Sequence, residues 1–269
     1  MAVLAVLLIA GGIWVGGGPL AGRDEVWQRI QETGEWRVGL DPSFPPFEML
    51  DGIGRPIGFD VDLAEQIAAS WGVTVTFHSI GFDSLFDAVM AGRIDSAISA
   101  LPVDPRFARD VSYSIPYFDA GLVWLTRSDR LTISHLADWG DKRVAVERGS
   151  ESDAFLRRLS QRVPDVLVER YPSCGAVVRV VLEGNADVTL LDAITAWQVV
   201  AHNPGLQIVG EVVEPLPYVA VLPMNAPRLM REVNRAIIAL QTAGELDRLQ
   251  QKWLTGGEGS AVGQGQACR

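Results

Sequence analysis

The stretch from Arg37 to Val73 constrains the fold of this chain more than any other part of the sequence. It begins with a short apolar run that indicates a buried strand, and Pro45-Pro46 keeps the loop that follows out of a helix. Asp51 to Gly54 is a turn signal between two short apolar segments, which predicts a hairpin. Asp60 is then expected to cap a helix that ends at Gly72. This order of strand, stiff loop, hairpin and helix is typical of an open α/β sheet.

The composition excludes several classes of function. With 269 residues, 48% of them hydrophobic, the chain is long enough to bury a core and to form one large or two small domains. Its formal net charge of −10 argues against a nucleic-acid partner, because affinity for the phosphate backbone depends on positive side chains. We expect the acidity to serve solubility.

The cysteines and histidines indicate neither a disulfide framework nor a metal site. Cys174 and Cys268 could pair in an oxidising compartment, but a cysteine beside the last residue is expected to be free. His78, His135 and His202 are far apart in the sequence and lack the spacing of metal ligands. We therefore expect no metal and no other cofactor.

Residues 1–22 have the composition of a targeting segment. Ala2 to Val15 is uncharged and largely apolar and is followed by small residues, as in a secretory signal. The basic start of such a signal is missing, because Arg23 is the first positive side chain. We expect export with cleavage, and the alternative is an uncleaved helix that tethers the protein to a membrane.

Two passages of the chain share one pattern. Residues 85–99 (LFDAVMAGRIDSAIS) and 177–191 (VVRVVLEGNADVTLL) each run from an apolar helix through a glycine and an aspartate into a strand. Both passages come after a strand–loop–helix unit, so we interpret them as parts of two related lobes whose loops face each other. The matched positions are Gly92 with Gly184 and Asp95 with Asp187.

The rest of the pattern supplies the remaining helices and strands. Asp83 is expected to cap the helix of residues 85–91, and the segment from Gly149 to Asp153 is a good helix start. A late apolar strand begins at Tyr218, and Pro227 opens the helix that follows it. The Gly-rich tail after Leu254 is expected to be disordered.

The segment GFDVDLA, from Gly58 to Ala64, carries a resemblance to a known family. Together with the strand, the Pro-rich loop and the hairpin before it, this segment resembles the opening of the polar-amino-acid-binding family of extracellular solute-binding proteins. These are the receptors that feed ABC importers, and the similarity extends from Glu35 to Leu254. It implies an α/β, two-lobed periplasmic-binding-protein fold. Each lobe would be a small α/β sheet sandwich, and a two-crossing hinge would join the lobes.

The resemblance also implies how the chain is divided and what it binds. The first lobe would comprise residues 23–118 and 218–254, the second lobe residues 119–217, and a tail the remaining residues 255–269. The crossings between the lobes would lie near Phe118 and Pro217. The expected partners are a small-molecule ligand and the membrane subunits of an ABC importer, and the protein itself is expected to be monomeric.

Several loops are expected to converge on a cleft between the lobes. Aromatic rings and a carboxylate suit a small ligand with a cationic amine, and a helix start can receive an anionic group through backbone N–H donors. Each residue also has a structural interpretation as a core or capping residue. In the resembled family, however, the matching positions contact the ligand, and the position of Asp192 takes its α-ammonium group. The expected ligand-binding residues are Phe44, Phe82, Ser99, Ala100, Pro102, Arg106, Gly149, Ser150, Glu151 and Asp192.

One departure from the family pattern bears on the ligand. In the family, the loop after Ser99 usually carries an arginine that pairs with the ligand's α-carboxylate. Here Phe107 falls at that position, and Arg106, one residue earlier, would have to swing into the same space to supply the planar fork. Pro102 replaces a hydroxyl residue, and Glu151 adds a carboxylate. These changes shift the expected ligand from a zwitterionic amino acid toward an amine or another cation.

The leading hypothesis is an extracytoplasmic solute-binding protein that closes around an amino acid or amine and is recognised by an ABC importer. No nucleophile–base spacing and no Gly-rich phosphate loop indicates an enzyme. The first alternative is an exported cyclohexadienyl (prephenate or arogenate) dehydratase. In that case Glu151 or Asp192 would be the general acid, and Arg106 or Arg148 would hold the substrate carboxylates. The second alternative is a ligand-sensing ectodomain held by an uncleaved N-terminal helix.

Overall fold

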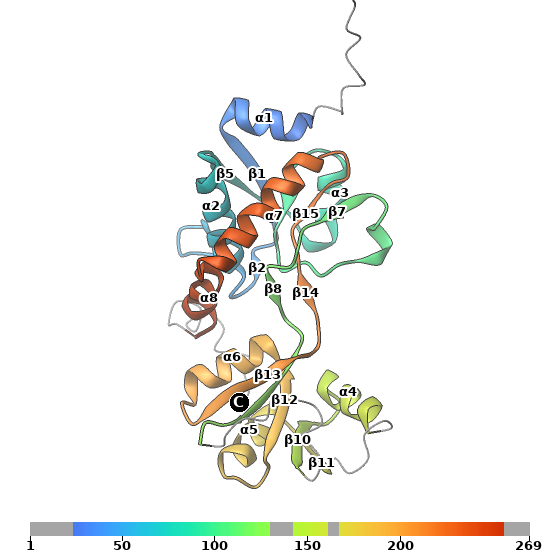
Figure 1. Ribbon diagram of the computed structural model, residues 1–269, viewed down its shortest axis with the longest axis vertical. Coiled ribbons are helices and arrows are strands. Elements are labelled where there is room, and N and C mark those ends of the chain that lie inside the picture. Colours follow the sequence, from blue (N-terminus) through green and yellow to red (C-terminus); the bar gives the residue numbers. More distant parts are fainter. Residues whose placement is uncertain (1–23, 130–141, 161–166, 256–269) are drawn as a thin grey trace, which may run out of the picture.

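The computed structural model describes residues 24–129, 142–160 and 167–255. It shows two α/β lobes stacked along the long axis of the molecule and joined by two strands (Figure 1). The two-lobed fold expected from the sequence is therefore confirmed. The expected targeting segment, His135 and the tail after Thr255 lie outside the described residues. Within the described ranges, no helix is long and apolar enough to cross a membrane.

The first lobe is built on a five-stranded sheet with a small hairpin sheet beside it. Its strands are β1 (Glu35–Leu40), β2 (Ser43–Phe44), β3 (Glu48–Leu50), β4 (Pro56–Ile57), β5 (Thr74–Ser79), β6 (Ser96–Ala97), β7 (Val111–Tyr113) and β15 (Val221–Pro223). Its helices are α1 (Glu25–Thr33), α2 (Phe59–Trp71), α3 (Leu85–Met90), α7 (Pro227–Thr242) and α8 (Glu245–Gln250), with the short turns η1 (Phe82–Ser84) and η2 (Pro105–Phe107).

The order of strands in the first lobe is β5-β1-β6-β15-β7. β1 runs parallel to β5 and β6, whereas β15 runs antiparallel to β6 and β7. Trp36, Val38 and Leu40 of β1 are fully buried, so this strand lies at the centre of the lobe. β15 comes from the last part of the described chain, yet it lies inside the sheet, between β6 and β7. The predicted hairpin is confirmed by the antiparallel pairing of β3 and β4.

Two predicted helix starts are wrong. α2 begins one residue before Asp60, and the residue that precedes it is Gly58, with φ at 142°. A Cβ at Gly58 would lie 2.1 Å from the carbonyl oxygen of Phe47, so only glycine allows this close approach. Asp60 therefore lies inside the first turn and is buried. Asp83 lies within η1, and Ser84 precedes α3 without a side-chain cap.

The second lobe has its own five-stranded sheet, in the order β11-β10-β12-β9-β13. Its strands are β9 (Leu122–Arg127), β10 (Arg143–Glu147), β11 (Leu167–Tyr171), β12 (Val188–Asp192) and β13 (Leu206–Glu214), and its helices are α4 (Glu151–Leu159), α5 (Cys174–Leu182) and α6 (Ala193–His202). β10 runs parallel to β11 and β12, whereas β9 runs antiparallel to β12 and β13.

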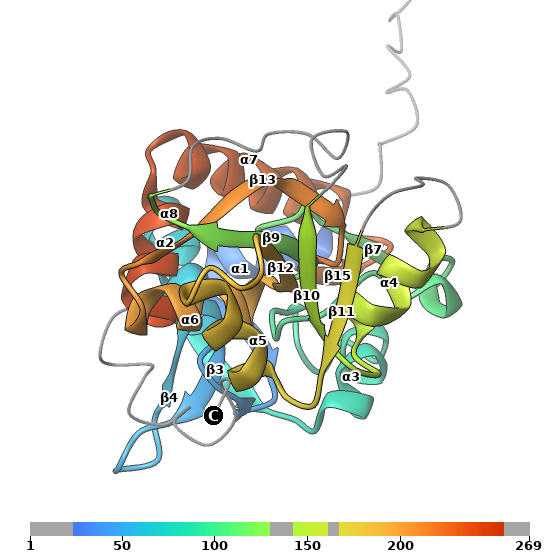
Figure 2. The same cartoon turned by 90° about the horizontal axis from the view of Figure 1, so that it is seen from below.

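Helices cover both faces of the second sheet. Val146 and Leu190 pack with Leu156 of α4 on one face. Ala145 and Leu191 belong to the larger cluster that includes residues of α5 and α6 on the other face. Seen along the long axis, α4 lies on one side of the strands and α5 and α6 lie on the other (Figure 2). The start of α4 and the start of α6 are thereby placed at the carboxyl ends of β10 and β12.

Two short antiparallel strands, β8 (Phe118–Asp119) and β14 (Pro217–Tyr218), connect the lobes. Asp119 Oδ1 accepts hydrogen bonds from the backbone N–H groups of Gly121 and Leu216, at 2.9 and 2.8 Å. A Cβ at Gly121 would lie 2.1 Å from the carbonyl oxygen of Glu214, so the two crossings touch at a glycine. We propose to divide the lobes at these strands. The last described turn, η4 (Gln251–Thr255), packs against α6 of the second lobe.

Candidate functional site

The first lobe contributes an aromatic half-pocket at the carboxyl ends of β1 and β6. The rings of Phe44 and Phe82 are 43% and 46% exposed, which is high for phenylalanine and leaves both available to a ligand. Asp41, at the end of β1, accepts a hydrogen bond from the backbone N–H of Phe82 at 2.8 Å. The residues lining this half-pocket are Asp41, Ser43, Phe44, Glu48, Phe82, Ala100, Pro102, Leu216 and Tyr218.

A buried polar network supports the wall of this half-pocket. Ser99 Oγ donates to Glu48 Oε1 at 2.9 Å. The N–H of Ala100 donates to Asp60 Oδ2 at 2.6 Å, and the hydroxyl of Tyr117 donates to the same oxygen at 3.0 Å. Ala100 has φ at +45°, a left-handed conformation that is unfavourable for a residue with a Cβ. The carboxylate of Asp60 therefore holds the pocket-lining backbone of Ala100 in a strained conformation.

Glu48 and Asp60 form a buried pair of acids. Burial, reinforced by the charge of Asp60, raises the pKa of Glu48 far above its ordinary value, so Glu48 is protonated at neutral pH. Burial also raises the pKa of Asp60, whereas the hydrogen bond from Glu48 lowers it. Glu48 Oε2 and Asp60 Oδ1 are buried, and no other described residue hydrogen-bonds to either atom. Glu48 thus lines the pocket as a neutral acid.

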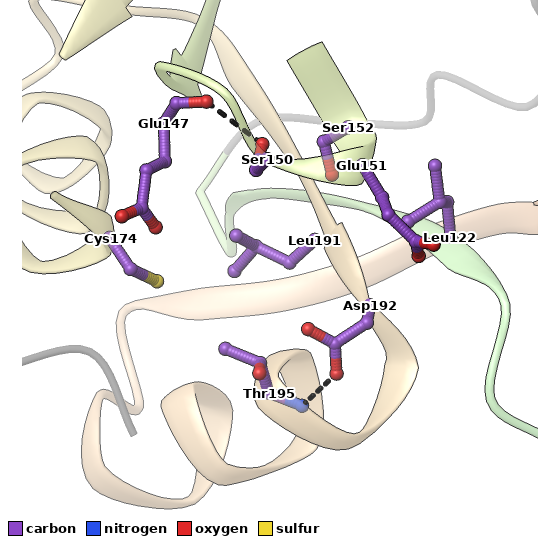
Figure 3. A pocket seen from close by; sticks show the side chains of 9 residues that line it. All are labelled: Leu122, Glu147, Ser150, Glu151, Ser152, Cys174, Leu191, Asp192 and Thr195. Atoms are coloured by element: carbon purple, nitrogen blue, oxygen red, sulfur yellow. Dashed lines mark hydrogen bonds between the residues drawn. The ribbon is translucent and has the colours of Figure 1, made fainter. Parts of the chain in front are cut away.

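The second lobe contributes an acidic half-pocket at the starts of α4 and α6 (Figure 3). Ser150 caps α4 through the N–H of Asp153, at 3.1 Å, and Asp192 caps α6 through the N–H of Thr195, at 2.8 Å. The other carboxylate oxygen of Asp192 points into the pocket, as Figure 3 shows. The cavity has a volume of about 270 Å³ and is lined by Leu122, Glu147, Ser150, Glu151, Ser152, Cys174, Leu191, Asp192 and Thr195.

Behind the start of α4 lies a second buried acid, Asp153. Its carboxylate accepts hydrogen bonds from Arg157 at 2.6 Å, from the N–H of Gly149 at 3.0 Å and from Arg170 at 2.8 Å. The hydrogen bond from Arg157, followed by those from Gly149 and Arg170, holds the pKa of Asp153 well below its ordinary value. This acid is therefore ionised, and it fixes the loop that carries Ser150.

A further cavity along the crossing strands lies between the two half-pockets and shares lining residues with each of them. This third cavity, next to Gly121, shares Leu216 with the first half-pocket and shares Leu122 and Glu151 with the second. Burial, then the charge of Asp60 and then that of Asp192 raise the pKa of Tyr218, which lines the first half-pocket. The loops of both lobes thus line neighbouring cavities, which together form the crevice.

The structure brings together most of the residues proposed from the sequence, but not all of them. Ser99 lies behind the pocket wall, and the N–H of Gly149 is taken by Asp153. Arg106 is 82% exposed and pairs with Asp104 at 2.6 Å, away from the lining residues. The proposed residues that line the crevice are Phe44, Phe82, Ala100, Pro102, Ser150, Glu151 and Asp192.

Sequence reasoning missed the lining residues that follow strands without an aromatic or helix-capping signal. Asp41 directly follows β1 and Glu147 ends β10, so the position of each at a carboxyl strand end was the available signal. Glu48 and Tyr218 belong to short strands, where they look like ordinary strand residues.

The cysteine prediction needs correction as well. Cys174 is disulfide-bonded, so the expectation that the cysteines stay apart is wrong; Cys268 lies outside the described residues. Of the described residues, no group of three or more histidine, cysteine, aspartate or glutamate side chains could hold a metal ion.

Two α/β lobes, a two-strand hinge and a crevice lined from both sides define a two-lobed ligand-binding protein. The family model of bacterial extracellular solute-binding proteins, family 3, matches residues 36–256, and the chain belongs to this family. It is 28% identical over 256 residues to the L-cystine-binding protein TcyJ of Escherichia coli, a match that covers 94% of this chain and 93% of that protein.

A second curated relative and a solved structure are also similar to this chain. The arginine-binding periplasmic protein of Mannheimia haemolytica is 27% identical over 225 residues, which cover 81% of this chain and 91% of that protein. Among solved structures, an ancestral cyclohexadienyl dehydratase superposes with a TM-score of 0.77 at 27% identity, covering 88% of this chain and 98% of that one. The two curated relatives are named as binding proteins for amino acids, which supports a binding function rather than an enzymatic one.

Proposed function

We propose that this solute-binding protein captures a small, positively charged ligand between its lobes and delivers it to an ABC importer. The observation that carries the proposal is the charge of the second half-pocket. Glu147, Glu151 and Asp192 line it, and none of the described lining residues is a lysine or an arginine. An organic cation is attracted by all three carboxylates. One relative named above is an arginine-binding periplasmic protein, and the side chain of arginine is a cation.

The first half-pocket suits the same ligand. Asp41 offers a carboxylate beside the exposed rings of Phe44 and Phe82, and aromatic faces attract ammonium and guanidinium groups. On closure about β8 and β14, these rings would cover the positive group held by Asp192. We further propose that the protein is exported through its N-terminal segment and acts as a monomer.

A thermal-shift screen with the full chain tests the proposal. The compounds are basic amino acids, polyamines, guanidines and quaternary amines, with acidic amino acids as the negative set. A ligand present at about a hundred times its Kd adds about 2.7 kcal/mol of stability, which is readily detected. Small-angle X-ray scattering with the best compound should show a smaller radius of gyration. If only anions raise the melting temperature, the proposal is wrong.

Asp192→Asn is the matching variant. Asparagine keeps the helix cap but removes the charge, so we expect affinity for the cation to fall about 30-fold or more, or about 2 kcal/mol. Glu211→Gln is the control, because Glu211 is an exposed acid on β13 that does not line the half-pocket. Titration calorimetry on the two variants separates a local charge effect from the loss of one charge on the whole lobe. Equal affinities in the two variants would remove Asp192 from the site.

The dehydratase alternative is less compatible with the crevice. Prephenate carries two carboxylates, and it would have to enter beside Glu147, Glu151 and Asp192. Of the two arginines proposed for that mechanism, Arg106 pairs with Asp104, and Arg148 is exposed and lines neither half-pocket. Incubation with prephenate should therefore give no phenylpyruvate absorbance, and its appearance would favour the enzyme.

A further inference from the structure

We propose that the ligand is an organic amine or guanidine that lacks a carboxylate group. This inference rests on the proposed function, capture of a cation, and it narrows the class of cation. A basic amino acid carries both a cationic side chain and an α-carboxylate. The question is therefore whether the crevice offers a receptor for that carboxylate.

Arg106 and Arg158 are already paired, and Arg148 is exposed and lines none of the three cavities. The guanidinium of Arg106 forms a fork with both oxygens of Asp104, at 2.6 to 3.1 Å. Arg158, beside the third cavity, donates to both oxygens of Glu214 at 2.7 Å. Because each fork is filled by a protein carboxylate, a ligand carboxylate would have to displace it.

The two arginines behind α4 are held in the same way. Arg157 and Arg170 both donate to Asp153, whose carboxylate also accepts from the N–H of Gly149. The hydroxyl of Ser150 accepts from the N–H of Asp153. Two backbone donors at the start of this helix are thereby used within the protein.

Phe107 and Pro102, which stand where the family pattern has an arginine and a hydroxyl residue, supply no anion receptor either. Phe107 stacks on Phe86, with ring centroids 4.4 Å apart and an angle of 17° between the planes, so its side chain packs inside the first lobe. Pro102 lines the aromatic half-pocket and has no backbone N–H to donate.

The balance of charge at the acidic half-pocket follows from these contacts. The starts of α4 and α6 each contribute about half a positive charge from the helix dipole. Against these stand the carboxylates of Glu147, Glu151 and Asp192. A ligand carboxylate would therefore meet net repulsion, whereas an amine or guanidinium at the other end would meet net attraction. The crevice thus selects for a cation without an attached carboxylate.

Matched pairs of compounds test this selection on the full chain. Agmatine is arginine without its α-carboxylate, and cadaverine is lysine without its own. Titration calorimetry should show the decarboxylated member binding at least tenfold more tightly in at least one pair. An amino acid that binds as tightly as its amine, or more tightly, in both pairs overturns the inference but leaves the proposed cation capture intact. If no cation in this set or the wider screen binds, the proposed function fails and the inference with it.

Two variants show whether the selection comes from the charges named above. Glu151→Gln removes one repelling carboxylate, so the preference for the amine should shrink while the amine still binds. Arg106→Ala should leave the preference unchanged, because this arginine pairs with Asp104 on the surface. A selective loss of amino-acid binding in Arg106→Ala would show that Arg106 swings in to hold the carboxylate, and the inference would be wrong.

Discussion

In each lobe, an arginine in the first half of a parallel strand pairs with an aspartate that comes just before the neighbouring strand. Arg37 donates its backbone N–H and its guanidinium to Asp95, and Arg143 does the same to Asp187, at 2.7 to 3.3 Å for the closest contacts. Each guanidinium also reaches the carbonyl of the glycine that ends the preceding helix, Gly92 or Gly184. The matched aspartates of the repeat, Asp95 and Asp187, thus each connect two neighbouring strands through an ion pair with an arginine.

The two ion pairs, Arg37–Asp95 and Arg143–Asp187, differ in burial. The Asp95 side chain is 1% exposed and also pairs with Arg29 of α1, whereas the Asp187 side chain is 13% exposed. Behind the crevice the lobes differ further, since Glu48 is a neutral acid in a cluster of acids and hydroxyls and Asp153 is an ionised acid among arginines. Similar backbones therefore leave the neighbouring side chains to decide both the strength of a contact and the charge of an acid.

The largest effect on the free energy of unfolding is expected from removing the more buried ion pair, that of Asp95. Asp95→Ala leaves Arg29 and Arg37 without their buried partner and should lower the free energy of unfolding by about 4 kcal/mol. Asp187→Ala is the matched variant and should cost less, because its site is more exposed. Urea unfolding followed by circular dichroism measures both. An equal or larger loss in Asp187→Ala would break the comparison.

An intermediate effect is expected at the ionised acid of the second lobe. Asp153→Asn weakens charged hydrogen bonds and should cost about 2 kcal/mol at pH 7. Because the folded-state pKa of Asp153 lies below its unfolded value, its stabilisation is present above about pH 3.9 and is lost as the pH falls. The penalty of the variant should therefore shrink at pH 3 in thermal unfolding. A penalty that stays constant from pH 7 to pH 3 would show that Asp153 acts through packing alone.

The smallest effect, with the opposite dependence on pH, is expected at the neutral acid of the first lobe. Unfolded Glu48 releases its proton above about pH 4.3, whereas the folded chain keeps it, so this group makes the protein less stable as the pH rises. Glu48→Gln keeps an acceptor for Ser99 and a donor for Asp60 without a proton to lose. Relative to the wild type, it should gain up to about 1.4 kcal/mol per pH unit between pH 7 and pH 8.

Unfolding of wild type and Glu48→Gln at both pH values measures this gain. Glu65→Gln is a control on the same lobe. Burial also raises the pKa of Glu65, but this side chain lies at an exposed position on α2. A stability difference that does not grow with pH would show that Glu48 is ionised in the folded protein.

Local signals in the sequence were enough for the architecture and for part of the crevice. The hairpin, the caps at Ser150 and Asp192 and the repeat of Asp95 and Asp187 depend on residues close in sequence or on one periodic pattern. The state of Glu48 could not be predicted in this way. It depends on contacts with Ser99 and Asp60, which lie 51 and 12 positions along the chain and meet only after the sheet has formed.

The error at Asp60 has the same physical origin. An aspartate near a helix start usually caps that helix. Here Gly58, in close contact with Phe47, precedes the helix instead, so α2 begins at Phe59, before Asp60. Asp60 is thereby turned inward and binds Ala100 instead. For Phe107, the sequence showed that an arginine was missing, and only the packing shows the ring stacked on Phe86.

β15 lies between β6 and β7 in the first sheet but follows both in the chain, so the first sheet is completed late in synthesis. β6 and β7 have both left the ribosome before β15, and the whole second lobe is made in between. The sheet of the first lobe therefore lacks the strand that joins β6 to β7 until residues 221–223 have been made. By then every strand of the second lobe has already been made. A nascent chain that pauses before β15 carries one finished half and one unfinished half.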